Sequence, residues 1–254
     1  MGVLSNKILL EELNPGDHIY SWRKAYIYAH HGIYIGDGIV IHFTRGAGQE
    51  IGTGTVLDRL LLTSVAPPHS TTNNAPPCPR CGDHTRSHGV ISSCLSCFLS
   101  GGDLYLFQYG VTPAFFLAKA RGGTCTLATS DPPEHVLHRA LFLLENGFGG
   151  YNVFKNNCED FAIYCKTGLL VSTSINVGRS GQAASYMAAA SAVVSSPIRF
   201  LTTGFGGLAL AGCGMYCVSR LVSDIGFRSD VSKVPVERLV IDLSSELDEP
   251  EKTP

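Results

Sequence analysis

The chain has 254 residues, which is enough for one large domain or for one domain with appendages. Apolar residues make up 44% of the sequence and charged residues 16%, so the chain can fill a sizeable core. The mean hydropathy is slightly positive, which favours a part that faces a membrane. A net charge of −2 without a long basic run argues against a nucleic acid as partner.

The cysteine content indicates an intracellular, reducing environment. Nine cysteines cannot all pair with one another, because the number is odd. The sequence does not open with a charged segment and an apolar stretch, so a secretory signal is not expected. In a reducing compartment, free thiols serve metal binding or catalysis more often than disulfides.

Residues 15–45 are predicted to form β structure. Gly36-Asp37-Gly38 stands between two runs of β-branched residues, which is typical of a hairpin. A further strand is predicted at 104–109. The stretch between them, residues 64–101, has a loop composition and carries four cysteines, so we interpret it as an insertion in the sheet.

Two helices are predicted after this region. The first is capped by Ser130-Asp131, has Pro132 in its first turn and ends at Gly147. The second begins at Asn157, a good N-cap residue, and ends at Gly168.

The composition changes after residue 180. Residues 180–228 are predicted to form an apolar helical segment. The last residues, 244–254, are acidic and polar and are expected to be disordered.

Cys158 is the first candidate for chemistry, because it follows the N-cap of a predicted helix. A cysteine in the first helical turn feels the helix dipole and unpaired backbone N–H groups, and both favour the reactive thiolate. The structural alternative is a buried packing cysteine, since free cysteine is among the most buried residue types.

The histidines before it favour catalysis. His30 and His42 lie on the two predicted strands of the hairpin and can approach each other across it. One would then act as a base and the other would orient it. The side chain of His31 would point to the opposite face of the strand. The alternative is that all three are surface residues or satisfied residues of the sheet.

Three short motifs occur together in this sequence. They are Pro15-Gly16-Asp17-His18-Ile19, the run His30-His31-Gly32-Ile33-Tyr34-Ile35-Gly36-Asp37-Gly38 followed by His42-Phe43, and Asn157-Cys158-Glu159 followed by Phe161. In combination they resemble the lecithin:retinol acyltransferase-like family, a permuted branch of the NlpC-type papain-like fold. The resemblance covers residues 14–170 and implies an α+β catalytic domain with an antiparallel sheet and helices.

The resemblance also implies the roles of the site residues. His30 would be the general base, His42 the orienting histidine, and Cys158 the nucleophile that carries an acyl thioester. We expect a ring nitrogen of His30 within about 4 Å of the Cys158 sulfur. The family commonly has histidine where this chain has Asp160, a difference that bears on substrate preference. The cysteine-containing insertion resembles the plant-type members.

That insertion predicts a metal site. Cys78, Cys81, Cys94 and Cys97 form two C-x-x-C motifs separated by twelve residues. Four thiolates around a structural zinc ion is the leading interpretation, because a segment with so little apolar content needs a metal to fold. A disulfide or redox pair, or no ligand, are the alternatives.

The apolar run 200–219 has the length of a bilayer crossing, and we expect membrane association. The alternative is an amphipathic or buried helix of the globular part. Arginines flank both ends, so the orientation is not readable. Gly2 lies in a near match to a myristoylation motif, which is a weaker hypothesis.

These observations favour a membrane-associated thiol acyltransferase or phospholipase A-type hydrolase acting on a phospholipid or another acyl-lipid ester. The alternative is a catalytically silent, membrane-tethered adaptor that uses the fold and the zinc insertion to bind a partner. A papain-like peptidase or amidase would fit the fold but not the apolar segment. The acyl acceptor and any protein partner are not indicated.

Overall fold

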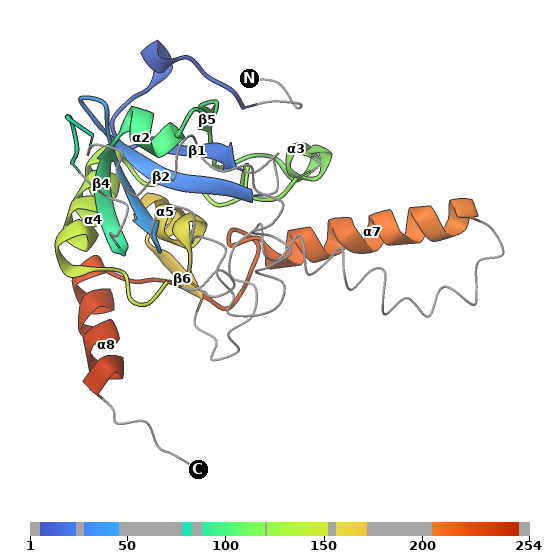
Figure 1. Cartoon of the computed structure of the whole chain (residues 1–254). Coiled ribbons are helices and arrows are strands. Elements are labelled where there is room, and N and C mark those ends of the chain that lie inside the picture. Colours follow the sequence, from blue (N-terminus) through green and yellow to red (C-terminus); the bar gives the residue numbers. More distant parts are fainter. Residues whose placement is uncertain are drawn as a thin grey trace, which may run out of the picture.

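The computed structural model describes residues 6–23, 28–45, 78–82, 88–119, 121–151, 156–171 and 205–248. These ranges form an α+β fold around a five-stranded antiparallel sheet of order β4-β3-β2-β1-β5, as expected for the class (Figure 1). The strands are β1 (His18–Arg23), β2 (Tyr28–Gly36), β3 (Ile39–Thr44), β4 (Gly89–Cys94) and β5 (Tyr105–Leu106). The strand predicted at 104–109 is therefore shorter than expected.

The predicted hairpin joins β2 to β3. Gly36, Asp37 and Gly38 have φ angles of 103°, 51° and 72°, so the turn needs residues that tolerate the left-handed region. The turn sets the register, in which Ile33 pairs with Ile41. Because side chains alternate along each strand, this register places His30 and His42 on the same face.

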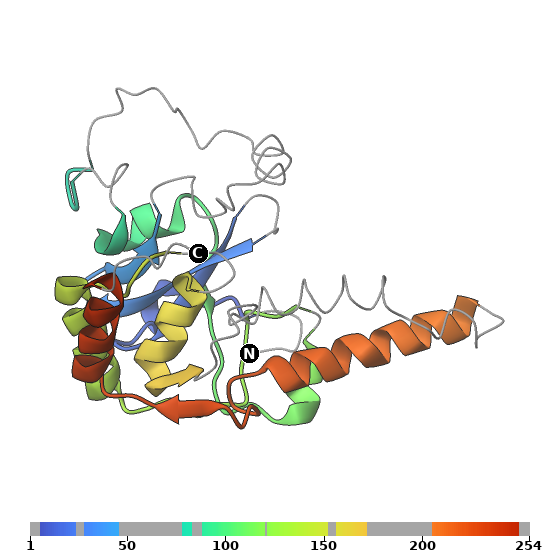
Figure 2. The same cartoon turned by 90° about the horizontal axis from the view of Figure 1, so that it is seen from below.

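Helices cover both faces of the sheet. Helices α4 (Pro133–Asn146) and α5 (Cys158–Thr167) lie on one side, and the short helix α2 (Leu95–Leu99) lies on the other (Figure 2). The α4–α5 side is the larger core, in which both helices pack on Ile33, Ile41 and Phe43. On the α2 side Phe98 packs with Ile19 and Val40.

Both predicted helices are present. Helix α5 has Asn157 as its N-cap and ends at Gly168, with φ of 68°, as the sequence predicts. Helix α4 ends at Gly147 as predicted, but its N-cap is Pro132 and not Ser130-Asp131. Asp131 instead accepts hydrogen bonds from Arg139 and Lys233, which explains why it does not cap the helix.

The segment 64–101 is not a separate insertion along its whole length. Strand β4 is the edge strand of the main sheet, where it pairs with β3 over six residues. Helix α2 follows it directly and covers the sheet. Residues 78–82 form a tight turn, and the remainder of the segment lies outside the described residues.

The C-terminal part returns to the domain. Strand β6 (Leu169–Val171) pairs with β7 (Val231–Lys233), and α8 (Val236–Asp248) packs beside α4. Val236 and Leu239 are buried in the main core. The expectation of disorder from residue 244 is therefore corrected for 244–248, which are helical, while 249–254 lie outside the described residues.

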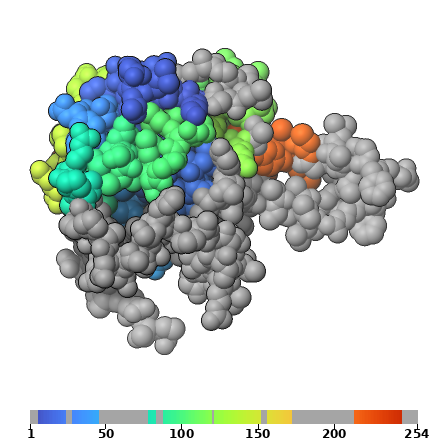
Figure 3. All heavy atoms as spheres, turned by 45° about the horizontal axis from the view of Figure 1, so that its top comes forward, coloured from blue at the N-terminus to red at the C-terminus, as the bar shows by residue number. Residues whose placement is uncertain are grey.

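Helix α7 (Phe205–Ser223) contains most of the predicted apolar run and emerges at the edge of the rounded body (Figure 3). No helix within the described ranges is both long and apolar enough to cross a bilayer. Arg220, which was expected to flank a membrane segment, is buried. Its guanidinium lies over Phe116 of helix α3 (Pro113–Ala118) and donates to the carbonyl of Lys119. Residues 172–204, and Gly2, lie outside the described residues.

Candidate active site

Cys158 is the first residue of α5, and the capping of this helix fixes its backbone. The Asn157 side chain accepts hydrogen bonds from the backbone N–H groups of Glu159 and Asp160, at 2.9 and 3.3 Å. The Asp160 carboxylate in turn accepts from the N–H of Asn157 at 3.1 Å, which completes a capping box. The thiol is thus held at the positive end of the helix dipole.

The sulfur lies against the edge of β2. The backbone N–H and C=O of Tyr34 bond to Asp17 and Gly16, on the β1 side of β2. Successive residues of a strand direct these groups to opposite sides, so the carbonyl of Ala29 points to the β3 side. Among the described residues, the pairing of β2 with β3 runs from Gly36 to Ile33, so Ala29 lies beyond the last paired residue. The Cys158 thiol donates to the Ala29 oxygen at 3.9 Å. It therefore contacts the peptide group that joins Ala29 to His30.

The two predicted histidines meet on adjacent strands, as expected. Nε2 of His30 and Nδ1 of His42 are 2.9 Å apart, and Nε2 of His42 lies 3.0 Å from the hydroxyl of Ser93 on β4. The ring of Phe98 packs on both imidazoles, with centroid separations of 5.4 Å to each. The chain His30–His42–Ser93 is buried throughout.

The expected approach of a His30 ring nitrogen to within about 4 Å of the Cys158 sulfur stays a prediction. The rings of His30 and His42 lie on the face covered by α2, whereas α5 packs on the other face. Within the described residues, Nδ1 of His30 is buried without a hydrogen-bond partner. Catalytic hydrogen bonds are often loose in the free enzyme and tighten around the substrate, so an Nδ1 without a partner among the described residues is compatible with a base.

The hydrogen-bond directions decide what His30 can do. If His42 donates from Nε2 to Ser93, its Nδ1 accepts from Nε2–H of His30, and Nδ1 of His30 is a free lone pair. If Ser93 donates, the order reverses and Nδ1 of His30 carries a proton. Only the first arrangement makes His30 a base. Burial, and next His42, hold the pKa of His30 well below 6.5, which keeps the ring neutral.

A second histidine chain occupies the opposite face of the sheet. Nδ1 of His31 and Nε2 of His18 are 2.8 Å apart, and Nδ1 of His18 lies 2.7 Å from the hydroxyl of Tyr109. Burial lowers the pKa of His31 to about 3. The side chain of His31 points away from His30, as alternation predicts, but it points towards the α5 side and is not exposed to solvent.

The four predicted metal ligands converge. The sulfurs of Cys78, Cys81, Cys94 and Cys97 all lie within 4.8 Å of one another. Cys94 is 3.8 Å from Cys78 and 3.6 Å from Cys81. A tetrahedral zinc site with Zn–S bonds of about 2.3 Å has sulfur–sulfur edges of about 3.8 Å, so the spacing fits a tetrathiolate metal ion. All four thiols are free of disulfides.

In this cluster, which we call the four-cysteine centre, hydrogen-bond donors favour the thiolates of Cys78 and Cys94, whereas burial raises the pKa of the Cys81 and Cys97 thiols. Cys78 and Gly82 exchange backbone hydrogen bonds in a tight turn, and Gly82 has a φ of 79°. N–H groups of Arg80 and Cys81 lower the pKa of the Cys78 thiol. For Cys94 burial acts in the opposite direction, but the Ser96 hydroxyl and the N–H of Cys97 lower the pKa to about 6.

Comparison with known proteins identifies the family. Residues 11–171 match the family model described as Lecithin retinol acyltransferase. The chain belongs to the lecithin retinol acyltransferase family. It is also 60% identical to Protein LEAD-SENSITIVE 1 of Arabidopsis thaliana over 248 residues, which is 97% of this chain and 93% of that protein. The matched region contains His30, His42, Cys158 and the four-cysteine centre.

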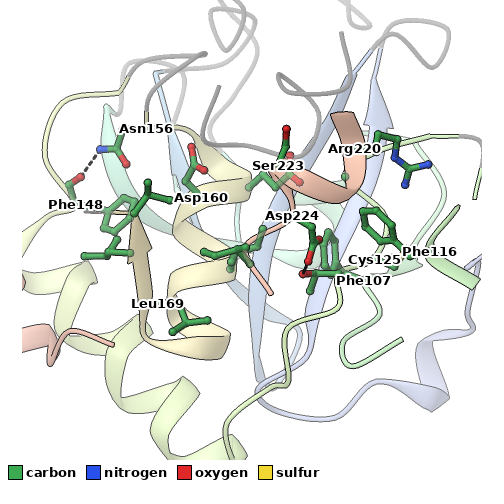
Figure 4. Close-up of a pocket in the computed structure, with 18 residues that line it drawn as sticks. Phe107, Phe116, Cys125, Phe148, Asn156, Asp160, Leu169, Arg220, Ser223 and Asp224 are labelled. Carbon is green, nitrogen blue, oxygen red and sulfur yellow. Dashed lines mark hydrogen bonds between the residues drawn. The ribbon is translucent and has the colours of Figure 1, made fainter. Parts of the chain in front are cut away.

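This member of the family has a largely apolar pocket beside the start of α5 (Figure 4). Glu159 and Asp160, which directly follow Cys158, line it, and Arg220 and Asp224 lie at the other end. Its apolar lining comes from α5, β6 and the segments around them, including Phe107, Phe116, Phe148, Ile163, Leu169, Leu170, Val171 and Ile225. Sequence periodicity did not indicate this pocket, because its walls come from distant segments.

Two residues that contact the histidine pair, Ser93 and Phe98, are not indicated by the sequence. Ser93 contacts a histidine 51 positions away, and a single serine carries no distinguishing signal. Phe98 resembles any apolar helix residue. The signal that the sequence offers for them is their position next to Cys94 and Cys97, which by themselves indicate only a metal site.

Proposed function

We propose that this chain is a thiol acyltransferase or lipid-ester hydrolase that forms an acyl thioester on Cys158. The observation that supports this most is the free, buried Nδ1 of His30. It is held in a His30–His42–Ser93 chain, and the neighbouring peptide group contacts the thiol. Membership of the family supports acyl transfer from the same residues.

In the first step His30 removes the proton from the Cys158 thiol. The thiolate attacks the carbonyl carbon of an ester, forming a carbon–sulfur bond and an oxyanion. The oxyanion collapses, the carbon–oxygen bond breaks, and the departing alcohol takes the proton from His30. The acyl group remains on the sulfur as a thioester.

In the second step an alcohol, an amine or water attacks the thioester. His30 takes the proton of the attacking group, the carbon–sulfur bond breaks, and the proton returns to the sulfur. While His30 is protonated, its Nε2–H continues to donate to Nδ1 of His42. His42 therefore fixes the ring orientation in both steps, and the Ser93 hydroxyl accepts from Nε2 of His42 in the tautomer that the mechanism needs.

We infer that the donor is a phospholipid or a similar acyl lipid. The pocket is lined by Glu159 and Asp160, which follow the nucleophile in the chain, and its aromatic and aliphatic side chains would suit part of an acyl chain. Exposed Val218 and Val222 on α7 support association with a membrane inside the cell.

We also propose that the four-cysteine centre holds a structural zinc ion. Four sulfurs at near-tetrahedral spacing, with backbone N–H donors aimed at two of them, fit this ion. A sheet whose histidine strands precede the cysteine helix is compatible with a permuted papain-like arrangement.

The alternative is an adaptor without catalytic activity. It is favoured by one observation, namely that the Cys158 thiol donates to a backbone carbonyl. In that case the thiol would be a packing residue and the histidine chain a buried structural network.

Intact-protein mass spectrometry after incubation with a diacyl phospholipid separates these functions. We expect an acyl adduct on the wild type and on the Cys213→Ala control, whose thiol is exposed on α7, and none on Cys158→Ala. An adduct from a peptide ester but not from a phospholipid would favour a peptidase. Absence of any adduct on the folded wild type would support the adaptor.

A further inference from the structure

The four-cysteine centre and the histidine chain share one short piece of backbone. Ser93, whose hydroxyl lies 3.0 Å from Nε2 of His42, directly precedes Cys94 at the end of β4. Cys94 is also the N-cap residue of α2, and its side chain does not cap that helix. The partner of His42 and a cysteine of the cluster are therefore neighbours in the chain.

A second connection runs through α2. Phe98 follows Cys97 and is almost fully buried, with its ring against both His30 and His42. Gly32 permits this approach, because a β-carbon there would lie 2.9 Å from the Phe98 ring. The two imidazoles are thus held by Ser93 on one side and by Phe98 on another.

Helix α2 has five residues, too few to be stable by itself. A metal ion bound to Cys94 and Cys97 would close its first turn and tie that turn to the Cys78–Gly82 segment. The position of Ser93 and of Phe98 would then depend on the metal.

We propose that a thiophilic divalent cation, zinc in the first instance, binds the four-cysteine centre and positions His42, and through it His30. Ser93 and Phe98 are the positioning residues. The metal would contact neither the substrate nor the Cys158 thiol. The consequence for catalysis rests on the proposed acyl transfer, whereas the positioning itself does not.

Side-chain ¹⁵N–¹H spectra of histidine-labelled full-length protein test the positioning without any substrate. The zinc-loaded protein is compared with protein stripped by a chelator and then reloaded with zinc, and zinc content is measured at each stage. We expect one zinc per chain and a reversible change in the signals of His30 and His42. The His18–His31 pair lies on the opposite face of the sheet and serves as the internal control, whose signals should persist.

Three results would overturn the proposal. The first would be that the protein binds no zinc at these cysteines. The second would be that the His30 and His42 signals do not change when zinc is removed. The third would be that the signals of both histidine pairs change together, because the metal then holds the whole fold. An inactive protein that still shows the selective change would refute the proposed function alone. An active protein whose signals and rate both ignore zinc would refute the positioning alone.

Ser93 variants provide the second measurement. Ser93→Ala should keep its zinc but form the Cys158 adduct about five- to tenfold more slowly, as the loss of one orienting hydrogen bond implies. Ser93→Thr keeps the hydroxyl and should restore the rate. Equal rates for Ser93→Ala and wild type, or failure of threonine to rescue, would contradict a positioning role for this hydroxyl.

Discussion

Replacing Gly32 with alanine tests the packing that holds the histidine pair. A β-carbon at this position would lie 2.7 Å from Cγ1 of Val40, 2.9 Å from Cε2 of Phe98 and 3.1 Å from the carbonyl oxygen of Ile41. All three neighbours are almost fully buried, so none can move aside into solvent. The added methyl group must displace the Phe98 ring or separate β2 from β3.

Overpacking of this kind costs about 1–3 kcal/mol of unfolding free energy. For a chain of this size each kcal/mol corresponds to about 2–4 °C in Tm, so Gly32→Ala should lower Tm by about 2–12 °C. Thermal unfolding followed by circular dichroism measures the shift. Because the displaced ring contacts His30 and His42, formation of the Cys158 adduct should also slow.

Gly214→Ala is the matched control. It lies within α7, where an added β-carbon meets no atom within 4 Å, and alanine favours a helix by about 1 kcal/mol. Its Tm should not fall. If Gly32→Ala leaves Tm unchanged, or if both variants lose stability equally, the packing of Phe98 over the histidine pair is not as described.

Three further predictions concern the cap, a buried acid and the metal. Asn157→Ala should lower the free energy of unfolding, measured by urea denaturation, by about 1 kcal/mol. Asn157→Asp should keep most of the wild-type stability, because its side-chain oxygen can also cap α5. Burial raises the pKa of Asp224 above 3.8, so the folded chain holds this proton more tightly and the carboxylate opposes folding at neutral pH. Asp224→Asn keeps the three bonds made to Oδ1, so its free energy of unfolding relative to wild type should be highest at pH 7 and decline as the pH falls. Zinc removal should make the four cluster thiols reactive towards a thiol reagent, and unchanged reactivity would contradict a metal site there.

Features set by local sequence were predicted well. The bounds of α5 follow from two residues. The side chain of Asn157 caps the first turn, and the positive φ of Gly168 ends the helix, both through local interactions. The β2–β3 turn follows from Gly36-Asp37-Gly38 for the same reason. The convergence of the four sulfurs follows from the spacing of two C-x-x-C motifs.

Features set by distant contacts were not predictable. The acidic composition of residues 244–254 predicts a disordered tail, but 244–248 continue α8, whose Val236 and Leu239 are buried against α4, about a hundred residues earlier. Pro132 occupies the N-cap position of α4, and Asp131 does not cap the helix because its carboxylate bonds to Arg139 and Lys233. The second histidine chain depends on the register between β1 and β2, which pairs Tyr20 with His31 and which no local pattern specifies.

The sequence predicted that His30 and His42 meet, and the approach of His30 to the thiol stays a prediction. Alternation along β2 correctly separates His30 from His31, yet it does not reveal which face α5 covers. The structure places α5 on the His31 side and the sulfur at the edge between the two faces. An experiment must therefore decide whether His30 or His31 acts as the base.

That question is decided by the rate of Cys158 adduct formation in His30→Gln and His31→Gln, measured in a single turnover by intact-protein mass spectrometry. Glutamine keeps a hydrogen-bonding side chain at both positions but cannot accept the thiol proton as imidazole does. The account predicts that His30→Gln slows the adduct by about 10²–10⁴-fold, as loss of a general base does, and that His31→Gln stays much closer to the wild type. A larger loss in His31→Gln than in His30→Gln, with both proteins folded, would contradict the assignment of His30 as the base.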